Sequence, residues 1–150
     1  MMFLVMNGRV RSERKHYISA GIQTEWGLYM IKLGEICFSS GNVRKLADFY
    51  KRVLMIDNGS DDNSLQVLEV AGVRISIFDD GTTKPNNNQN ITLIFDVDDV
   101  DGEYERLRGI EGFKLHFIRK PYDGSDGHRF MSFYDLDGNR VNFRNIGEKS

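Results

Sequence analysis

Two stretches of this chain begin with the same pattern of hydrophobic and polar positions. Residues 35–39 alternate in polarity and lead into a segment whose apolar residues recur at helical spacing, and residues 92–96 do the same. A second matched pair, residues 72–76 and 138–142, starts at a glycine in each case. We therefore predict one structural unit that occurs twice, which places matched positions on the two halves of one molecule.

The first copy is predicted to run from residue 31 to about residue 80. Alternation predicts strands, helical spacing predicts a helix with Asn42 as its N-cap, and polar turn residues separate the elements. The weakest pattern is that of the second strand. The predicted elements are a strand at 33–39, a helix at 43–54, a short strand at 55–57, and a hairpin of strands 65–70 and 73–78.

The second copy is predicted to occupy residues 90–146, after a polar loop at 79–90. Asp98 and Asp99 are expected to cap its helix, where carboxylates suit the helix dipole. Both copies then read βαβββ, which predicts an α+β fold with a curved, mixed, mostly antiparallel sheet and helices on one face. The predicted elements are a strand at 91–97, a helix at 100–110, a strand at 113–117, a flexible loop at 120–127, and a hairpin of strands 129–134 and 140–144.

Residues 1–29 have no counterpart elsewhere in the chain, so we interpret them as an N-terminal extension to a single domain of residues 30–150. Two alternatives are open for this extension. One is a natural start at Met30 or a loosely packed segment. The other is an added helix over about residues 18–29, with Trp26 and Leu28 packed on the domain.

Alternate residues of a strand point to opposite faces of the sheet, so the predicted strands define two sets of side chains. The first set is apolar throughout and should form the core beneath the helices: Ile36, Phe38, Ile75, Ile77, Leu93, Phe95, Val97, Val141 and Phe143. The second set, here called the cup face, is mixed and mostly polar: Glu35, Cys37, Ser39, Ser76, Phe78, Thr92, Ile94, Asp96, Asn142 and Arg144. Small-molecule sites combine apolar surface with a few polar groups, so we favour a ligand-binding cup over a merely solvated face.

Composition narrows the class of protein. The formal net charge of −2, with Lys and Arg dispersed among Asp and Glu, argues against a dedicated nucleic-acid surface. The one cysteine, Cys37, excludes an intrachain disulfide. No apolar run approaches the ~20 residues of a membrane-spanning helix. We expect a cytoplasmic protein that binds neither nucleic acid nor membrane.

Three motifs, in the order in which they occur along this chain, resemble those of the vicinal oxygen chelate superfamily. This superfamily includes glyoxalase I, bleomycin-resistance proteins, fosfomycin-resistance proteins and extradiol dioxygenases. Residues 42–50 (NVRKLADFY), with Val53 and Leu54, are similar to the family's first helix, D-L-x-x-x-x-x-F-Y-x-x-x-L. Residues 97–101 (VDDVD) resemble the opening of its second helix. Residues 134–139 (YDLDGN) resemble its D-P-D-G-N hairpin, with Leu136 in place of proline. The resemblance covers residues 31–145 and implies the fold rather than the reaction.

The resemblance also implies four metal-ligand positions, which the family's metal enzymes fill with His, Glu or Gln. In this chain they carry Glu35, Ser76, Thr92 and Asn142. Only Glu35 is a strong ligand, whereas a catalytic transition metal usually has about three protein ligands. We therefore expect no metal and no other cofactor.

Several functions follow as hypotheses. The first is a metal-free protein, resembling bleomycin-resistance members, that binds a small, partly aromatic molecule through the cup-face residues Glu35, Cys37, Ser76, Phe78, Thr92, Ile94, Asn142 and Arg144. The alternative is a metal-dependent lyase or isomerase of the glyoxalase type, or a dioxygenase, with Glu35 as the candidate catalytic residue. A third is an accessory protein with a vestigial cup. Whether the protein is an enzyme stays open, with binding favoured over catalysis. A homodimer is expected, because two short modules leave strand edges to be covered.

Overall fold

The computed structural model describes residues 21–24, 27–30, 33–60, 62–81 and 90–145, and divides the chain into two compact units, 1–33 and 34–150. In the first unit, β1 (Gly21–Thr24) and β2 (Gly27–Met30) form an antiparallel pair. The alternative of a helix over residues 18–29 is therefore wrong for this segment. Residues 1–20 and Trp26 lie outside the described residues.

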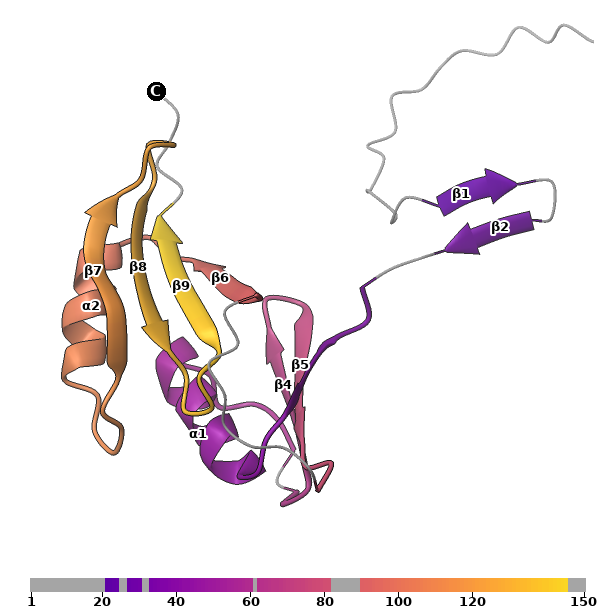
Figure 1. Cartoon of the computed structure of the whole chain (residues 1–150). Coiled ribbons are helices and arrows are strands. Elements are labelled where there is room, and N and C mark those ends of the chain that lie inside the picture. Colours follow the sequence, from indigo (N-terminus) through magenta and orange to yellow (C-terminus); the bar gives the residue numbers. More distant parts are fainter. Residues whose placement is uncertain (1–20, 25–26, 31–32, 61, 82–89, 146–150) are drawn as a thin grey trace, which may run out of the picture. The chain divides into compact units, whose positions relative to one another are not determined.

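The second unit contains both predicted copies, here called the first and second modules (Figure 1). It carries no helix long and apolar enough to cross a membrane among the described residues. The first module consists of β3 (Ile36–Ser39), α1 (Val43–Leu54), β4 (Leu65–Val70) and β5 (Val73–Phe78). The second consists of β6 (Thr92–Asp96), α2 (Val100–Arg108), β7 (His116–Asp123), β8 (Arg129–Tyr134) and β9 (Arg140–Asn145).

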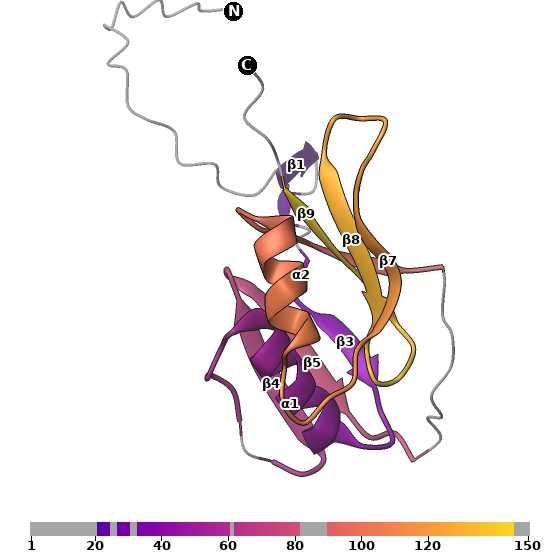
Figure 2. The ribbon, with the colours of Figure 1, turned by 90° about the vertical axis from the view of Figure 1, so that its left-hand side faces the viewer.

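Each module has its own sheet, in the order β3-β5-β4 or β6-β9-β8-β7. In both sheets the first strand pairs in parallel with the last, and the remaining pairs are antiparallel. Helix α1 packs on β4 and β5, and α2 packs on β7, β8 and β9 (Figure 2). The predicted α+β fold, with mixed sheets and helices on one face, is confirmed.

The registers of the two sheets repeat residue for residue. Cys37 lies opposite Ser76 in the first module, and Ile94 lies opposite Asn142 in the second. On β4, Val67 is the next partner of Ser76, just as Ser132 on β8 is the next partner of Asn142. The sequence repeat is therefore a structural repeat, and equivalent positions lie on equivalent faces.

The helices begin where the sequence predicts. The side chain of Asn42 accepts a hydrogen bond from the backbone N–H of Lys45, and that of Asp99 accepts from Asp101 and Gly102. Each cap satisfies backbone donors that have no partner within the helix. The second helix ends at Arg108, so Ile110 lies beyond it.

The predicted second strand of the first module, at residues 55–57, is wrong. Met55 adopts a left-handed conformation with φ of 53° and ends α1. The chain then follows the outer edge of β4 with side chains in place of a strand. Asn58 donates to the carbonyl of Glu69 and accepts from its N–H, and both distances are 2.9 Å.

Two residues further on, Ser60 also bonds to the edge of β4 through its side chain. Its hydroxyl donates to the carbonyl of Leu65 at 3.0 Å and accepts from the N–H of Val67 at 3.2 Å. Gly59, between Asn58 and Ser60, has φ of 115°, and a Cβ there would lie 2.7 Å from the carbonyl oxygen of Val67. Glycine is needed for so close an approach, and the open edge of β4 is covered without a fourth strand.

The seventh strand is longer and later than predicted. We expected a strand at 113–117 and a flexible loop at 120–127, but β7 extends from His116 to Asp123 and includes Pro121. Proline is tolerated because β7 is an edge strand, where a missing N–H removes no ladder hydrogen bond. Two irregularities in the pairing with β8, on either side of Arg119, shift the register.

The predicted apolar face forms the core. Ile75, Ile77, Leu93, Val141 and Phe143 are buried, and the other four predicted residues are half-buried against them. Ring contacts extend the core from one module to the other. Phe49 of the first module meets Phe113 of the second edge to face at 5.6 Å, while Tyr50 stacks on Phe38 within the first module with 5.8 Å between ring centroids.

A buried polar network also joins the modules. The hydroxyl of Tyr50, on α1, donates to Oδ2 of Asp135 in the β8–β9 turn at 2.7 Å. Asp135 also accepts from the backbone N–H groups of Asp137 and Asn139 and from the side-chain amide of Asn139. Tyr50 is fully buried, and Asp135 is 6% exposed. Burial, followed by the charge of Asp135, raises the pKa of Tyr50 well above its ordinary value.

Replacing Tyr50 by Phe should lower the free energy of unfolding by about 1.5–3 kcal/mol at pH 7, because a hydrogen bond to a buried carboxylate is lost. Urea unfolding measures the change. The raised pKa means that the folded protein holds this proton more tightly than the unfolded chain. The stability it contributes is therefore complete below the ordinary tyrosine pKa of about 10 and decreases above it.

Tyr104→Phe is the matched control, because Tyr104 contacts Phe117 and Arg108 rather than a carboxylate. Its effect should stay within about 0.5 kcal/mol. Two results would show that the Tyr50–Asp135 bond does not stabilise the fold. One is an equal loss of stability in the two variants. The other is a free energy of unfolding that decreases at alkaline pH in Tyr50→Phe just as it does in the parent protein.

Candidate functional site

The first module brings three of the predicted site residues together. Glu35 lies just before β3, Cys37 is on β3, and Ser76 is opposite Cys37 on β5. The hydroxyl of Ser76 donates to Oε2 of Glu35 at 2.6 Å. Ser76 is 5% exposed, whereas Glu35 and Cys37 are exposed. Phe78 is half-buried two residues further along β5.

The thiol of Cys37 lies in an unfavourable setting for its anion. Desolvation, then the charge of Glu35 and a hydrogen bond with it, raises the pKa of Cys37. A nucleophilic cysteine needs the opposite shift, because the thiolate is the reactive form. This site is therefore poorly suited to cysteine catalysis.

The second module carries the other four predicted residues on β6 and β9. Thr92 and Ile94 lie on β6, while Asn142 and Arg144 lie on β9 with their side chains on the same face. Arg144 is held by Asp96, its register partner, with Nε 2.8 Å from Oδ1. This ion pair neutralises the one carboxylate that β6 contributes to the cup face.

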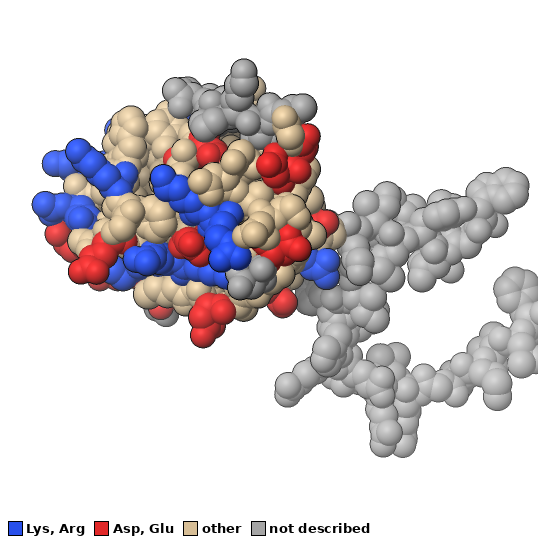
Figure 3. Space-filling model, turned by 90° about the horizontal axis from the view of Figure 1, so that it is seen from below, with Lys and Arg blue, Asp and Glu red and all other residues tan. Residues whose placement is uncertain are grey.

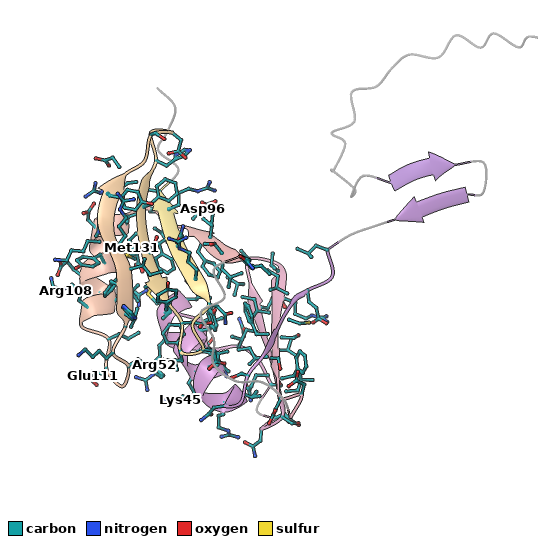
Figure 4. The ribbon with its side chains drawn as sticks, viewed as in Figure 1. Lys45, Arg52, Asp96, Arg108, Glu111 and Met131 are labelled. Carbon is teal, nitrogen blue, oxygen red and sulfur yellow. The ribbon has the colours of Figure 1, made fainter. Side chains whose placement is uncertain are left out.

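A cavity of about 540 Å³ lies where β6 meets the first module, and we call it the seam cavity. Its size falls within the range for small-molecule sites, and its lining is mostly apolar with Thr92 and Asp96 as polar members. Figure 4 shows Asp96 beside β6 and β9. The lining residues are Ile36, Val70, Ala71, Val73, Ile75, Thr92, Leu93, Ile94, Phe95 and Asp96.

The predicted residues thus fall into two groups. Thr92 and Ile94 line the seam cavity, and Ile36 and Ile75 of the first module line it with them. The cavity lining contains none of the other six predicted residues, Glu35, Cys37, Ser76, Phe78, Asn142 and Arg144, which lie on the cup face of one module or the other. Sequence reasoning missed the apolar turn at Val70, Ala71 and Val73, because a strand pattern does not show which turn will meet the other module.

A second cavity, of about 430 Å³, lies on the helix side. Its lining combines apolar residues with four carboxylates, those of Asp96, Asp98, Asp99 and Glu103. Most of these carboxylates have structural partners, since Asp99 caps α2 and Glu103 pairs with Arg106 at 2.5 Å. We therefore place the candidate site at the seam cavity.

Arg140, which sequence reasoning also missed, is on the cup face next to this cavity. It is opposite Thr92 across β6–β9, and Asn142 is opposite Ile94. The Nε atom of Arg140 and the Oδ1 atom of Asn142 are buried and have no hydrogen-bond partner among the described residues. Its position two residues before Asn142 on one strand is the signal that would have identified Arg140.

Aromatic rings lie further along the same face. Tyr122 on β7 stacks on Phe130 of β8 with 5.8 Å between centroids, and the guanidinium of Arg119 lies 3.9 Å from the Tyr122 ring centre. Ser132 and Tyr134 continue β8 opposite Asn142 and Arg140. The second module therefore presents cations and aromatic rings on its cup face.

The four family ligand positions do not fit a catalytic metal. Glu35 supplies one carboxylate, already hydrogen-bonded by Ser76, while Ser76, Thr92 and Asn142 supply neutral oxygens and nitrogen. No group of three or more His, Cys, Asp or Glu side chains that could hold a metal occurs among the described residues. The donor chemistry alone argues against a tightly held transition metal.

Each of the two repeated modules pairs its first and last strands in parallel and is covered by one helix. This arrangement defines a class of α+β proteins in which equivalent positions of the two modules can contribute to one site. The sequence model of the Glyoxalase/Bleomycin resistance protein/Dioxygenase superfamily matches residues 32–143, and the chain belongs to this superfamily. The predicted resemblance is confirmed.

Solved structures share the fold at low identity. A glyoxalase/bleomycin resistance protein/dioxygenase from Nocardioides is 18% identical, with a TM-score of 0.65 over 81% of this chain and 87% of that one. The genomically encoded fosfomycin resistance protein FosX from Listeria monocytogenes is 16% identical, with a TM-score of 0.65 over 81% and 98%. Lactoylglutathione lyase from Agrobacterium tumefaciens is 16% identical, with a TM-score of 0.58 over 77% and 93%. A comparison with curated proteins finds no match.

The raised pKa of Cys37 predicts slow alkylation by iodoacetamide near pH 7, with a rate profile displaced to higher pH than that of a free cysteine. Glu35→Gln should move the profile back toward lower pH, because the carboxylate that disfavours the thiolate is gone. Only one cysteine exists, so mass spectrometry reads the rate directly. Coincident profiles for the two proteins would show that Glu35 does not act on the thiol.

Proposed function

We propose that this protein binds a small, partly aromatic molecule at the seam cavity and the adjoining cup face, without a metal. The supporting observation is the cavity of about 540 Å³, whose lining is apolar apart from Thr92 and Asp96. Such a lining suits an apolar body with few polar groups. The cup-face residues Glu35, Cys37, Ser76, Phe78, Thr92, Ile94, Asn142 and Arg144 are its proposed contacts.

The alternative is a metal-dependent lyase or isomerase of the glyoxalase type, or a dioxygenase. Glu35 favours it, because this carboxylate occupies a family ligand position and is exposed. The neutral groups at the other three positions oppose it, so binding is the preferred function and Glu35 is a candidate hydrogen-bond acceptor.

Metal analysis of protein purified without chelator should find well below one Zn, Ni, Mn or Fe per chain. In a thermal-shift series in EDTA, small aromatic compounds, 2-naphthamide among them, should raise the melting temperature of the protein. A ligand at one hundred times its Kd stabilises the native state by about 2.7 kcal/mol.

Two results would contradict the proposal. Roughly one tightly held ion per chain, removed by EDTA together with ligand binding, would establish the metal-dependent alternative. No shift with any aromatic compound, with or without added metal, would leave the cup as a vestigial feature.

We also propose that two copies associate, as a cytoplasmic homodimer. Among the described residues, β3 pairs only with β5, and β6 pairs only with β9, so one edge of each strand is open. Ile94, on β6, is 48% exposed, and Val73, at the start of β5, is 40% exposed. A two-fold partner would cover the same edges on both copies.

Light scattering over a dilution series should give twice the chain mass at high concentration. The interface of such a dimer should bury more than ~1,000 Å² in total. Ile94→Lys should shift the equilibrium toward monomer, because a charge would be buried in the interface. Glu111→Lys, a solvent-exposed substitution with the same product residue, is the control. A monomer at every concentration would overturn the dimer.

A further inference from the structure

The second module's cup face carries an excess of positive charge. Its strands place Arg119, Arg140 and Arg144 there with Asp96, and the charge of Asp126, in the β7–β8 loop, also acts on Arg144. Asp96 is already bound to Arg144 at 2.8 Å. The charge that is left over belongs to Arg119, which lies over the Tyr122 ring, and to Arg140.

Arg140 has a buried donor for which the described part of the chain offers no acceptor. Its Nε atom is buried and unpartnered among the described residues, and the same holds for Oδ1 of the neighbouring Asn142. A buried polar group left without a partner costs about 1–3 kcal/mol, so such atoms are normally satisfied by water or a ligand. Two of them, on alternate residues of one strand, form a ready donor–acceptor pair.

This pair adjoins the seam cavity. Thr92 and Ile94 line the cavity, and Arg140 and Asn142 are their register partners on β9. Neighbouring strands lie about 4.8 Å apart. A two-ring aromatic body in the cavity would therefore bring a substituent on its edge over Arg140.

We propose that the ligand of this site is an aromatic carboxylate, with its ring in the seam cavity and its carboxylate on Arg140. This inference rests on the proposed function and adds the charge of the ligand. A guanidinium N–H donates to a carboxylate more strongly than to a neutral carbonyl, and its plane also stacks on aromatic rings. Asn142 accepts a hydrogen bond from a donor on the ligand or from a water beside it.

Three probes with the same naphthyl body but different charges test whether the site selects for charge: anionic 2-naphthoate, neutral 2-naphthamide and cationic 2-naphthylmethylamine. Isothermal titration in EDTA at low salt should give the order naphthoate, then naphthamide, then the amine. Arg140→Gln should weaken naphthoate roughly tenfold or more while changing naphthamide little, since each tenfold corresponds to about 1.4 kcal/mol. Arg140→Lys should restore part of the preference, because the charge returns without the fixed donor.

Arg108→Gln is the matched control, because it removes the same charge from α2, where Arg108 pairs with Glu105 and is 55% exposed. Figure 4 shows Arg108 on the helix, away from Asp96. This variant should bind all three probes as the parent does. Should Arg140→Gln fail to fold, Asn142→Asp provides the second test, because a new carboxylate beside Arg140 should weaken naphthoate selectively.

The outcomes distinguish the two proposals. Equal binding of the three probes, or equal effects of Arg140→Gln and Arg108→Gln, would overturn the anion preference and leave the proposed binding function intact. Binding of none of the probes, together with no thermal shift for any other aromatic compound, would overturn both. Selective loss of naphthoate in Arg140→Gln alone supports the assignment.

Discussion

The hydrogen bond from Tyr50 to Asp135 is the constraint on which the arrangement of the two modules depends. It joins α1 of the first module to the β8–β9 turn of the second, and both side chains are buried. A buried carboxylate without partners would be costly. Asp135 instead accepts bonds from Tyr50, from two backbone N–H groups and from the side chain of Asn139. Next to Tyr50 on α1, Phe49 also contacts Phe113 of the second module.

This constraint reaches the candidate site through β9. The turn ordered by Asp135 leads directly into Arg140, and Asn142 follows two residues later. The start of β9 is therefore fixed on one side by the turn and on the other by pairing with β6 and β8. A donor and an acceptor held in this way are preorganised, which lowers the entropy cost of ligand binding. On the face shown in Figure 3, Lys and Arg lie among Asp and Glu.

Sequence patterns predicted those features that depend on period and register. The repeat from Glu35 to Thr92 and from Ser76 to Asn142 fixed which residues share a face, and the strand registers agree. Apart from the helix caps at Asn42 and Asp99, features set by single side chains or by packing were not predicted. Asn58 and Ser60 replace a whole strand by bonding to the edge of β4, and no periodicity reveals that. The seam cavity depends on how one turn meets another module. The lack of a partner for Nε of Arg140 among the described residues depends on which groups surround it in the fold.

A backbone ¹H–¹⁵N NMR titration with 2-naphthoate in EDTA tests both where the ligand binds and whether binding needs a metal. We predict saturable shifts at Ile36, Ile75, Thr92, Ile94 and Asn142, around the seam cavity, with little change at Gly102 and Glu103 on the helix side. Shifts centred on the helix-side cavity, or shifts that occur only after a divalent metal is added, would contradict this prediction.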